Sequence, residues 1–485
     1  MDLALYSLHF GRKCLILQAK QRISVMQVIE ISNFGPVKNA RIELHRLTVL
    51  IGEQASGKST IAKLIYFFKS ISEEFFSHYY QSDSEDFNNE TDLIFPIRER
   101  FYDFFGSTRH LPDFSIVYTY APERTLTLSL NEKKRLFPTF SKGFFSKSNR
   151  KLLKNLKGQI LRVNEELEKS INAQRRFTLE KDRMGYVNRL SEVINTIFTN
   201  QQNDSLFVIA GRNATVGYTD FFEKQLYTEI QNNIARAYQK RSQTIDEALM
   251  QRFIERVSRI KSLLMKHKDF EGLLEVAPKA SKQSLRDALD LITLILRGKY
   301  QTSEFGERLQ VENEQFVYLQ NASSGQQEAI RILQDVFVAL FEGNSVFRII
   351  EETEAHLFPM AQKYVIELLA LLLNSNNNNE LILTTHSPYV LSVLNNLLFA
   401  DRVISKNGNS QAEVNDVIPN YGHLKADDFA AYAVGDSFIK REDYCVSIVN
   451  QETGMIDQSY LDVVSELLSQ DFDKLYRIHA KSFAR

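Results

Sequence analysis

One short stretch of the chain has the residue types and the spacing needed to hold a row of phosphate groups. Gly52 is followed by four residues and then by Gly57, Lys58 and Ser59, which completes the phosphate-binding loop pattern G-x-x-x-x-G-K-[ST]. Glycines let a backbone wrap closely around phosphates, while the lysine and the serine would reach the terminal phosphates and a Mg²⁺ ion. The predicted nucleotide-binding residues are Gly52, Glu53, Gln54, Ala55, Ser56, Gly57, Lys58, Ser59 and Thr60.

The residues on either side of this loop predict the elements that position it. The apolar run 47–51 predicts a buried strand, and residues 60–65 predict the first turns of a helix. A helix N-terminus carries a partial positive charge, which would stabilise bound phosphates. A chance match is the competing explanation, but the bare pattern is expected in only roughly 1–2% of chains of this length.

A second predicted strand ends in two carboxylates. Residues 346–350, apolar except for Arg348, predict this buried strand, and Glu351 and Glu352 follow it directly. Carboxylates at the carboxyl end of a core strand can meet a Mg²⁺ ion and a water molecule. Solvated acids would be the default interpretation elsewhere, but the loop at Gly52 favours the functional one.

Two further segments could bring polar groups to the same site. Residues 381–385 predict a third strand that ends at His386, and a histidine there can sense a terminal phosphate, although a lone histidine is more often structural. The serine-rich segment 321–328 precedes a helical run, so Ser324 and Gly325 would open a helix whose free N–H groups could meet an anion. Alone, this last signal is weak.

Length and composition limit the classes of protein that fit. The 485 residues are enough for two or three domains, and a net charge of −1 gives no overall attraction to nucleic acid or membrane. Cys14 and Cys445 show no metal-ligand spacing and fit a reducing cytoplasm, and the start lacks the basic region of a signal peptide. The longest apolar stretch, 365–373, contains Glu367 and predicts a core helix and no membrane span.

The N-terminal part is predicted to be rich in strands. The alternation of apolar and polar residues from Met26 to Ile51 predicts a meander of strands. Residues 1–25 are either an extra strand or an over-long gene start with Met26 as the true initiator, and we slightly favour the second interpretation. The acidic segment 82–92 lacks apolar anchors and predicts a loop. Residues 114–120 and 125–130 alternate like the two strands of a hairpin.

The middle of the chain is basic and then helical, and we take residues 136–300 as one helical arm. Residues 133–157 carry nine Lys and Arg residues and no Asp or Glu. An amphipathic, partly coiled helix is predicted by apolar residues at three-four spacing: Leu153, Leu156, Ile160, Val163, Leu167 and Ile171. A strand-like insert covers residues 206–212. More helix is predicted from Asp220 to about Leu296, with one apolar face: Leu249, Phe253, Val257, Ile260 and Leu264.

The basic residues of this arm have two interpretations. Charged residues on a helix are more often a solvated face than a nucleic-acid site. A run without counter-charges weakens that default, so contact with DNA phosphates stays open for Lys147, Arg150, Lys151 and Lys154.

Together, these features resemble an ABC-type ATPase of the SMC, RecF and OLD group, within the AAA-family ATPases. The motifs that carry the resemblance are the loop, the helical insertion, Ser323-Ser324-Gly325-Gln326, the acidic strand end and Thr-Thr-His-Ser-Pro at 384–388. The resemblance is close over residues 26–66 and about 315–400, whereas the arm matches the family only in its position along the chain. The resemblance implies an α/β P-loop NTPase head with a mixed sheet, built from residues 1–135 and 301–485, with a cap from about residue 425. Within this tail, the sequence predicts a strand pair at 430–434 and 444–449 and a helix from Tyr460, which would cap the ATPase or dock a partner.

The resemblance also implies roles for single residues. Glu352 matches the general base that polarises the attacking water, and His386 matches the switch histidine. Glu351 matches the Walker B carboxylate, which with Ser59 would hold Mg²⁺. Residues 323–326 match the signature, which reaches across a dimer to the ATP bound by the partner's loop.

The segment 354–359 resembles the D-loop, and we take Glu354 as a candidate coupling residue. The chain also departs from the pattern: Glu351 stands where Asp is usual, Ser324 where Gly is commoner, and Thr353 where Pro is usual. We identify no Q-loop glutamine. Arg212 is our candidate for a phosphate or coupling contact, and a plain turn residue is the alternative.

Within that group, the chain most resembles the ATPases of anti-phage systems such as Septu and PARIS, because of the segment 351–359 and the short arm. This implies a cytoplasmic ATPase that hydrolyses ATP with Mg²⁺ and forms a homodimer or a larger homo-oligomer through its heads. It would control a separately encoded nuclease or toxin. Two alternatives stay open: a RecF-like DNA-binding ATPase of repair or recombination, and a scaffold that binds ATP without appreciable turnover.

Overall fold

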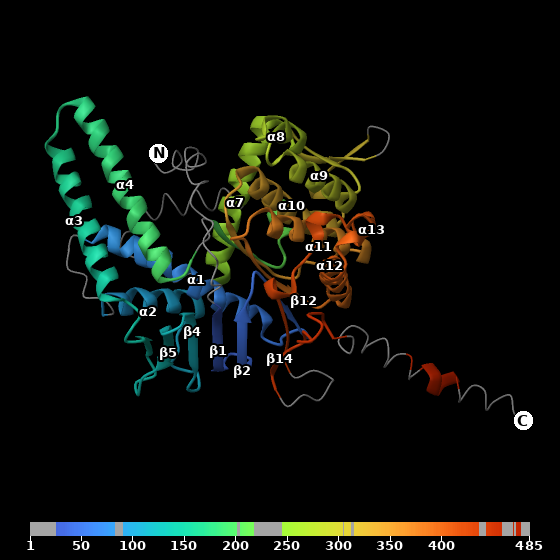
Figure 1. Ribbon diagram of the computed structural model, residues 1–485, viewed down its shortest axis with the longest axis horizontal. Coiled ribbons are helices and arrows are strands. Elements are labelled where there is room, and N and C mark those ends of the chain that lie inside the picture. Colours follow the sequence, from blue (N-terminus) through green and yellow to red (C-terminus); the bar gives the residue numbers. More distant parts are fainter. Residues whose placement is uncertain are drawn as a thin grey trace, which may run out of the picture.

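The computed structural model is a mixed α/β structure in which helices cover three sheets (Figure 1). It describes residues 26–82, 91–200, 204–217, 245–303, 305–311, 315–435, 443–457, 469 and 472–476. Our predictions for residues 1–25, for most of the loop 82–92, for residues 220–244 of the helical middle and for most of a helix from Tyr460 lie outside these ranges. None of the helices in the described ranges is both long enough and apolar enough to span a membrane.

The central sheet holds the strands that we predicted around the chemistry. Its order is β14-β13-β3-β12-β11-β7, parallel throughout except for β14. The strands are β3 (Leu47–Ile51), β7 (Asp204–Val208), β11 (Val346–Ile350), β12 (Glu380–Thr385), β13 (Phe429–Val434) and β14 (Cys445–Ser447). Because parallel sheets are covered on both faces, β3, β11 and β12 are mostly apolar and are buried along nearly their whole length, including Thr48 and Arg348.

A second, antiparallel sheet has the order β2-β1-β4-β5-β6. Its strands are β1 (Gln27–Phe34), β2 (Val37–Leu44), β4 (Ser115–Ala121), β5 (Arg124–Leu130) and β6 (Leu136–Phe140). The predicted hairpin is confirmed as β4 and β5. The predicted meander is wrong in its third strand, because β3 leaves β1 and β2 and pairs with β12 and β13. Burial alternates along β1 and β2, whereas the first four residues of β3 are all buried.

Helices surround the central sheet and connect its strands. They are α1 (Lys58–Gln81), α2 (Thr91–Phe105), α5 (Ala214–Gly217), α7 (Ile245–His267), α8 (Phe270–Val276), α9 (Lys282–Leu296), α10 (Ser324–Glu342), α11 (Pro359–Ser375), α12 (Pro388–Lys406) and α13 (Gln411–Val417). A small sheet precedes α10: β8 (Lys299–Ser303), β9 (Gly306–Gln310) and β10 (Phe316–Tyr318). Short 3-10 turns are η2 (Leu319–Asn321), η3 (Gly408–Ser410), η4 (Asn420–Gly422) and η5 (Ala426–Asp428). The predicted apolar face of α7 is confirmed, since all five of its residues are buried.

Only part of the region that we took as a helical arm projects from the head. Helices α3 (Lys147–Lys169) and α4 (Ala173–Ile197) form a hairpin that stands away from the rest of the molecule (Figure 1). Within residues 136–300, β6 and β7 instead belong to the two large sheets. The seam along α3 ends before Ile171, which is 98% exposed because α3 stops at Lys169. We therefore narrow the proposed arm to α3 and α4.

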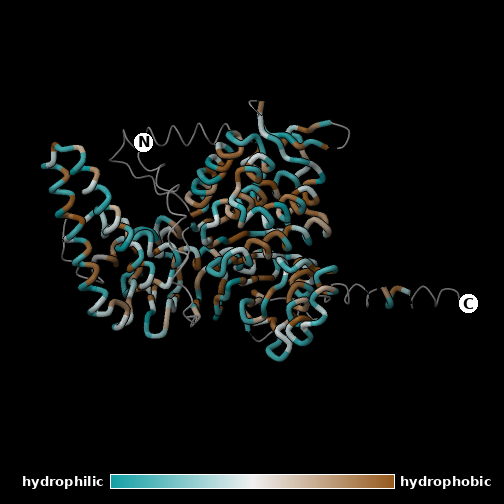
Figure 2. The backbone as a smooth tube through the Cα atoms, turned by 45° about the horizontal axis from the view of Figure 1, so that its top comes forward, coloured by the Kyte–Doolittle hydropathy of each residue, from teal (hydrophilic) through white to brown (hydrophobic). Residues whose placement is uncertain are grey.

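The distribution of apolar residues matches this division. Figure 2 shows the hydrophobic stretches gathered inside the head, whereas the projecting hairpin alternates between hydrophilic and hydrophobic positions. The C-terminal strand pair that we predicted is confirmed as β13 and β14. Strand β13 lies inside the central sheet beside β3, so this segment completes the head where we had expected an external cap.

Candidate active site

The phosphate-loop residues connect β3 to α1 at the carboxyl edge of the central sheet. The loop needs glycine at both ends. A Cβ at Gly52 would collide with the carbonyl oxygen of Val434, and a Cβ at Gly57 would lie 2.9 Å from Val37. Gly57 also has a φ of 90° as the residue that caps α1. Ala55 adopts a left-handed φ of 61°, which helps the short loop to turn.

Lys58 lies in the middle of this loop. Its ammonium group donates to the carbonyl oxygens of Gly52 at 2.9 Å and Glu53 at 2.7 Å, and to the hydroxyl of Ser56 at 3.3 Å. Burial lowers the pKa of Lys58 to about 8, even though carboxylates led by Glu352 oppose the shift. A lysine tuned in this way responds strongly to the arrival of negative charge.

Glu351 ends β11 in a buried position. One carboxylate oxygen, Oε2, accepts a hydrogen bond from the backbone N–H of Ala210 at 3.2 Å. The other, Oε1, is buried and has no hydrogen-bond partner within the described part of the chain. An ionised carboxylate oxygen without a partner is costly to bury, so this atom suits a cation. The hydroxyl-bearing Ser59 lies exposed at the start of α1.

Glu352 adopts a left-handed backbone conformation. Its φ is 44°, in a region that non-glycine residues occupy rarely and at a cost of about 1–3 kcal/mol. Its N–H group donates to the hydroxyl of Thr384 on β12 at 3.1 Å, which holds the turn after β11 against the neighbouring strand. The side chain remains 42% exposed, so water can reach the carboxylate.

His386 brings the loop and the acidic strand end together. Its Nδ1 lies 3.5 Å from Nζ of Lys58, and its Nε2 lies 3.6 Å from the carboxylate of Glu352. The backbone N–H of His386 donates to Glu354 at 2.5 Å. Three segments distant in sequence thus meet at the carboxyl edges of neighbouring parallel strands, as the strand predictions implied.

Arg212 is 1% exposed and lies beneath the acidic strand end. Its guanidinium donates to the carbonyl oxygens of Glu351 at 2.8 Å, Glu352 at 2.9 Å and Glu328 at 3.0 Å. It also pairs with the carboxylate of Glu328 at 3.4 Å. These contacts join the end of β11 to α10 and keep the guanidinium buried, which argues against a contact with phosphate. They are compatible both with a coupling residue and with a plain turn residue.

The signature-like segment opens α10 with a complete capping box. Ser323 caps the helix by accepting from the N–H of Gln326, and the Gln326 side chain accepts from the N–H of Ser323. Gly325 lies against the segment 354–359, since a Cβ there would sit 2.5 Å from the His356 carbonyl oxygen. Ser324 is exposed at the first turn. The segment therefore presents its helix N-terminus beside the candidate D-loop.

The basic residues of α3 lie on the projecting hairpin and contribute nothing to the loop. Lys147, Lys151 and Lys154 are exposed, and Arg150 donates to the Phe145 carbonyl oxygen at 3.0 Å. Lys157, which we counted in the same basic run, is buried and donates to the Tyr80 carbonyl oxygen at 2.7 Å.

Several residues around the site were not predicted from the sequence. Thr384 could have been suspected from its place before His386. Val434, Gly435 and Tyr444 could not, because nothing in the sequence shows that β13 lies beside β3 and brings them to the loop.

The geometry defines the class: a P-loop NTPase with an acidic strand end and a histidine beside the loop. A profile of the AAA ATPase domain matches residues 26–391, and the chain belongs to this family. No curated protein matches the chain.

Ninety chains of solved structures match, among them two SMC heads and a RecF protein. An SMC head bound to the C-winged helix domain of ScpA has 11% identity and a TM-score of 0.35, over 76% of this chain and 92% of that chain. The SMC head domain from Thermotoga maritima has 12% identity and a TM-score of 0.31, over 76% of this chain and 92% of that chain. The recombination mediator protein RecF-ATPrS has 10% identity and a TM-score of 0.30, over 86% of this chain and 98% of that chain.

Proposed function

We propose that the chain binds ATP at residues 52–60 and hydrolyses it, with Glu352 as the general base. The observation that carries this proposal is that His386 lies 3.5 Å from the ammonium group of Lys58 and 3.6 Å from the carboxylate of Glu352. Lysine supplies positive charge for the terminal phosphates, and the half-exposed carboxylate can take a proton from water. His386 lies between the two and would hydrogen-bond to the terminal phosphate.

The residues at the strand edge also fit a Mg²⁺ ion. The buried Oε1 of Glu351, which lacks a hydrogen-bond partner in the part of the chain that the structure describes, and the hydroxyl of Ser59 are oxygen ligands of the kind that Mg²⁺ prefers. When bound, the ion would neutralise charge on the phosphates. Glu351 would hold it from the sheet side, while its own Oε2 stays fixed by Ala210.

We propose that two copies enclose the nucleotide, with the segment 323–326 of one head facing the loop of the other. Large apolar side chains near the site support self-association: Phe358, Met360 and Tyr389 are exposed at the starts of α11 and α12. These two helix starts are neighbours, because Ser387 donates to Gln362 at 2.7 Å. Opening and closing of such a dimer would be the output of the ATP cycle, and Glu354 and Arg212 would transmit it.

The output would go to a separately encoded effector in anti-phage defence. This finer role rests on the resemblance of residues 351–359 and of the short arm to the ATPases of Septu and PARIS. The second candidate is a DNA-binding ATPase of repair or recombination. The exposed cations Lys147, Lys151 and Lys154 on the projecting hairpin favour it.

Steady-state ATP hydrolysis tests both candidates. Wild type should hydrolyse ATP, and Glu352→Gln should lower kcat by about 100-fold or more, because a general base contributes about 10²–10⁴. The exposed Glu413→Gln on α13 is the matched control and should keep the wild-type rate. If Glu352→Gln hydrolyses ATP at the wild-type rate, Glu352 is not the general base. Stimulation by duplex DNA that disappears when Lys147, Arg150, Lys151 and Lys154 are neutralised would make the DNA-binding role the leading one.

A further inference from the structure

The outer wall of the phosphate loop is built by a segment near the C-terminus. Strand β13 runs parallel to β3, so its carboxyl end reaches the same edge of the sheet as the loop. The chain then returns through β14, and the N–H of Gly435 donates to the Tyr444 carbonyl oxygen at 2.8 Å. Val434, Gly435 and Tyr444, which we call the C-terminal clamp, therefore lie together against the loop.

Each residue of the clamp touches the loop closely. The Val434 carbonyl oxygen occupies the place that a side chain at Gly52 would need. A Cβ at Gly435, where φ is 98°, would lie 2.5 Å from Cβ of Ser56. The Tyr444 hydroxyl donates to the Ser56 carbonyl oxygen at 2.6 Å in a buried contact. Val37 of β2 and the Tyr444 hydroxyl lie 2.9 Å and 3.2 Å from the place that a Cβ at Gly57 would take, so the loop is packed against two strand pairs.

The bond from Tyr444 fixes the orientation of one particular peptide group. In a trans peptide, the C=O and the N–H point in opposite directions. Because Tyr444 holds the Ser56 carbonyl toward the outer wall, the N–H of Gly57 is turned toward the inside of the loop. Inward N–H groups are what a phosphate loop uses to bind its ligand.

We infer that Tyr444 is a positioning residue that pre-orients the Ser56–Gly57 peptide for phosphate and so sets the affinity for ATP. The clamp lies beyond the residues 26–391 that match the family, so this support comes from the chain's own C-terminal segment. The inference rests on the proposed binding of ATP at residues 52–60. A loop that is already oriented loses less conformational freedom when it binds, which increases affinity.

The test is Tyr444→Phe, which removes one oxygen atom and keeps the ring. A lost buried hydrogen bond corresponds to about a tenfold change in an equilibrium constant, so KM and Kd for ATP should rise about tenfold while kcat stays near the wild-type value. The nucleotide-free melting temperature should fall by a few degrees, as expected for the loss of one buried hydrogen bond, and the rise in melting temperature on adding ATP should shrink.

Tyr432→Phe is the matched control. Tyr432 is also nearly buried, lies on β13 and uses its hydroxyl in a hydrogen bond, but its partner is the backbone of Glu43 on β2 at 3.0 Å. This variant should bind ATP within about twofold of wild type. If wild type binds ATP and Tyr444→Phe binds it equally well, the clamp inference is wrong. If wild type itself fails to bind ATP, the proposed function fails first.

Discussion

At the scale of residues, the site combines a buried lysine with carboxylates that are held from behind. Lys58 has a lowered pKa, Glu351 has one oxygen without a hydrogen-bond partner among the described residues, and Glu352 has a left-handed backbone. Each feature costs stability in the isolated protein. Costs of this kind gather at functional sites, where a ligand offsets them. ATP with Mg²⁺ carries the charges that would offset the first two.

The lowered pKa of Lys58 predicts that ATP binding depends on pH. With a pKa of about 8, Lys58 is largely neutral at about pH 9 and must take up a proton when phosphates arrive. Affinity should therefore fall as the pH rises from about 7.5 to 9, and binding at the upper end should be accompanied by proton uptake. Calorimetry in buffers of different ionisation enthalpy measures that uptake.

The same titration has a clear contrary outcome. An affinity that stays constant to about pH 9, with no proton taken up, would mean that Lys58 is fully charged before ATP binds. Working above about pH 7.5 keeps the titration of ATP itself out of the comparison.

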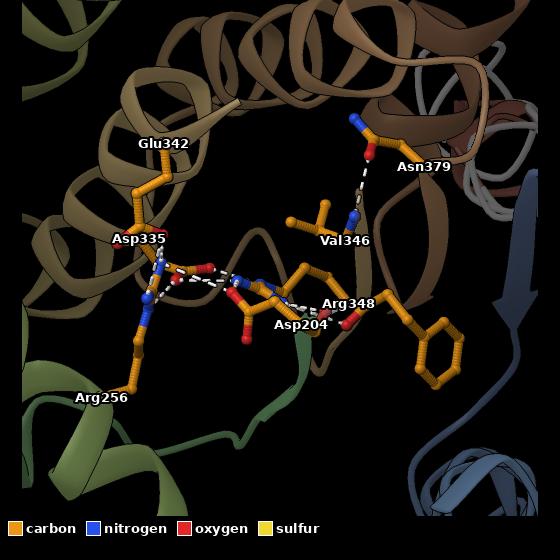
Figure 3. A network of polar contacts seen from close by, with 8 residues as sticks. Asp204, Arg256, Asp335, Glu342, Val346, Arg348 and Asn379 are labelled. Carbon is orange, nitrogen blue, oxygen red and sulfur yellow. Dashed lines mark hydrogen bonds and ion pairs between the residues drawn. The ribbon is translucent and has the colours of Figure 1, made fainter. Parts of the chain in front are cut away.

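At the scale of elements, α10 is fixed to the sheet by buried charges. Arg348 on β11 donates to Asp335 on α10 at 2.6 Å and to Asp204 on β7 at 2.6 Å (Figure 3). Arg256 of α7 reaches the same Asp335 carboxylate at 2.8 Å. The helix that opens with the signature-like segment is thus attached directly to β11 and α7, and through Arg348 to β7.

Burial alone would raise the pKa of Asp335, but Arg348 and Arg256 outweigh it and hold the pKa at about 2. Removing this carboxylate leaves guanidinium groups buried without their shared partner. Asp335→Ala should lower the free energy of unfolding by about 3–5 kcal/mol at pH 7, as measured by urea denaturation. The exposed Glu30 pairs with Arg41 at 2.7 Å, and Glu30→Ala should cost about 1 kcal/mol or less.

The sign of the pH effect follows from the lowered pKa. Asp335 contributes stability above its unfolded pKa of about 3.9 and loses that contribution as the pH falls toward 2. The gap between wild type and Asp335→Ala should therefore narrow in acid. A gap at pH 7 no larger than that of Glu30→Ala would show that the network contributes little.

Local patterns in the sequence predicted the strands that carry the site residues. They could not predict which strands distant in sequence pair with one another. The strands before Gly52, Glu351 and His386 are mostly apolar because both faces of the sheet are covered, so each could be recognised from its own residues. The order of β13, β3 and β12 depends on contacts hundreds of residues apart. That is why β3 was placed in the wrong sheet, and why Tyr444 was missed.

The helical middle shows the same limit. The three-four spacing along α3 and α7 was recognised correctly. Spacing alone does not say whether a helix projects or packs on a sheet, so α7 to α9 and β7 were assigned to the arm. Arg212 was singled out from a turn, but its contacts with the ends of β11 and with α10 required the fold.

At the scale of the whole molecule, the proposed mechanism needs a head whose ATP site is completed by a second copy. The loop, the acidic strand end and His386 come from one chain, and the exposed N-terminus of α10 would face the site of the other. A variant that binds ATP without hydrolysing it should therefore accumulate as a closed dimer.

Native mass spectrometry of Glu352→Gln after incubation with ATP and Mg²⁺ tests this mechanism most directly, because one spectrum reports both the assembly and its nucleotide. We expect a dimer that holds two intact ATP molecules, whereas wild type under the same conditions should carry ADP or be monomeric. Glu352→Gln found with ADP, or found only as a monomer with ATP bound, would contradict the proposed mechanism.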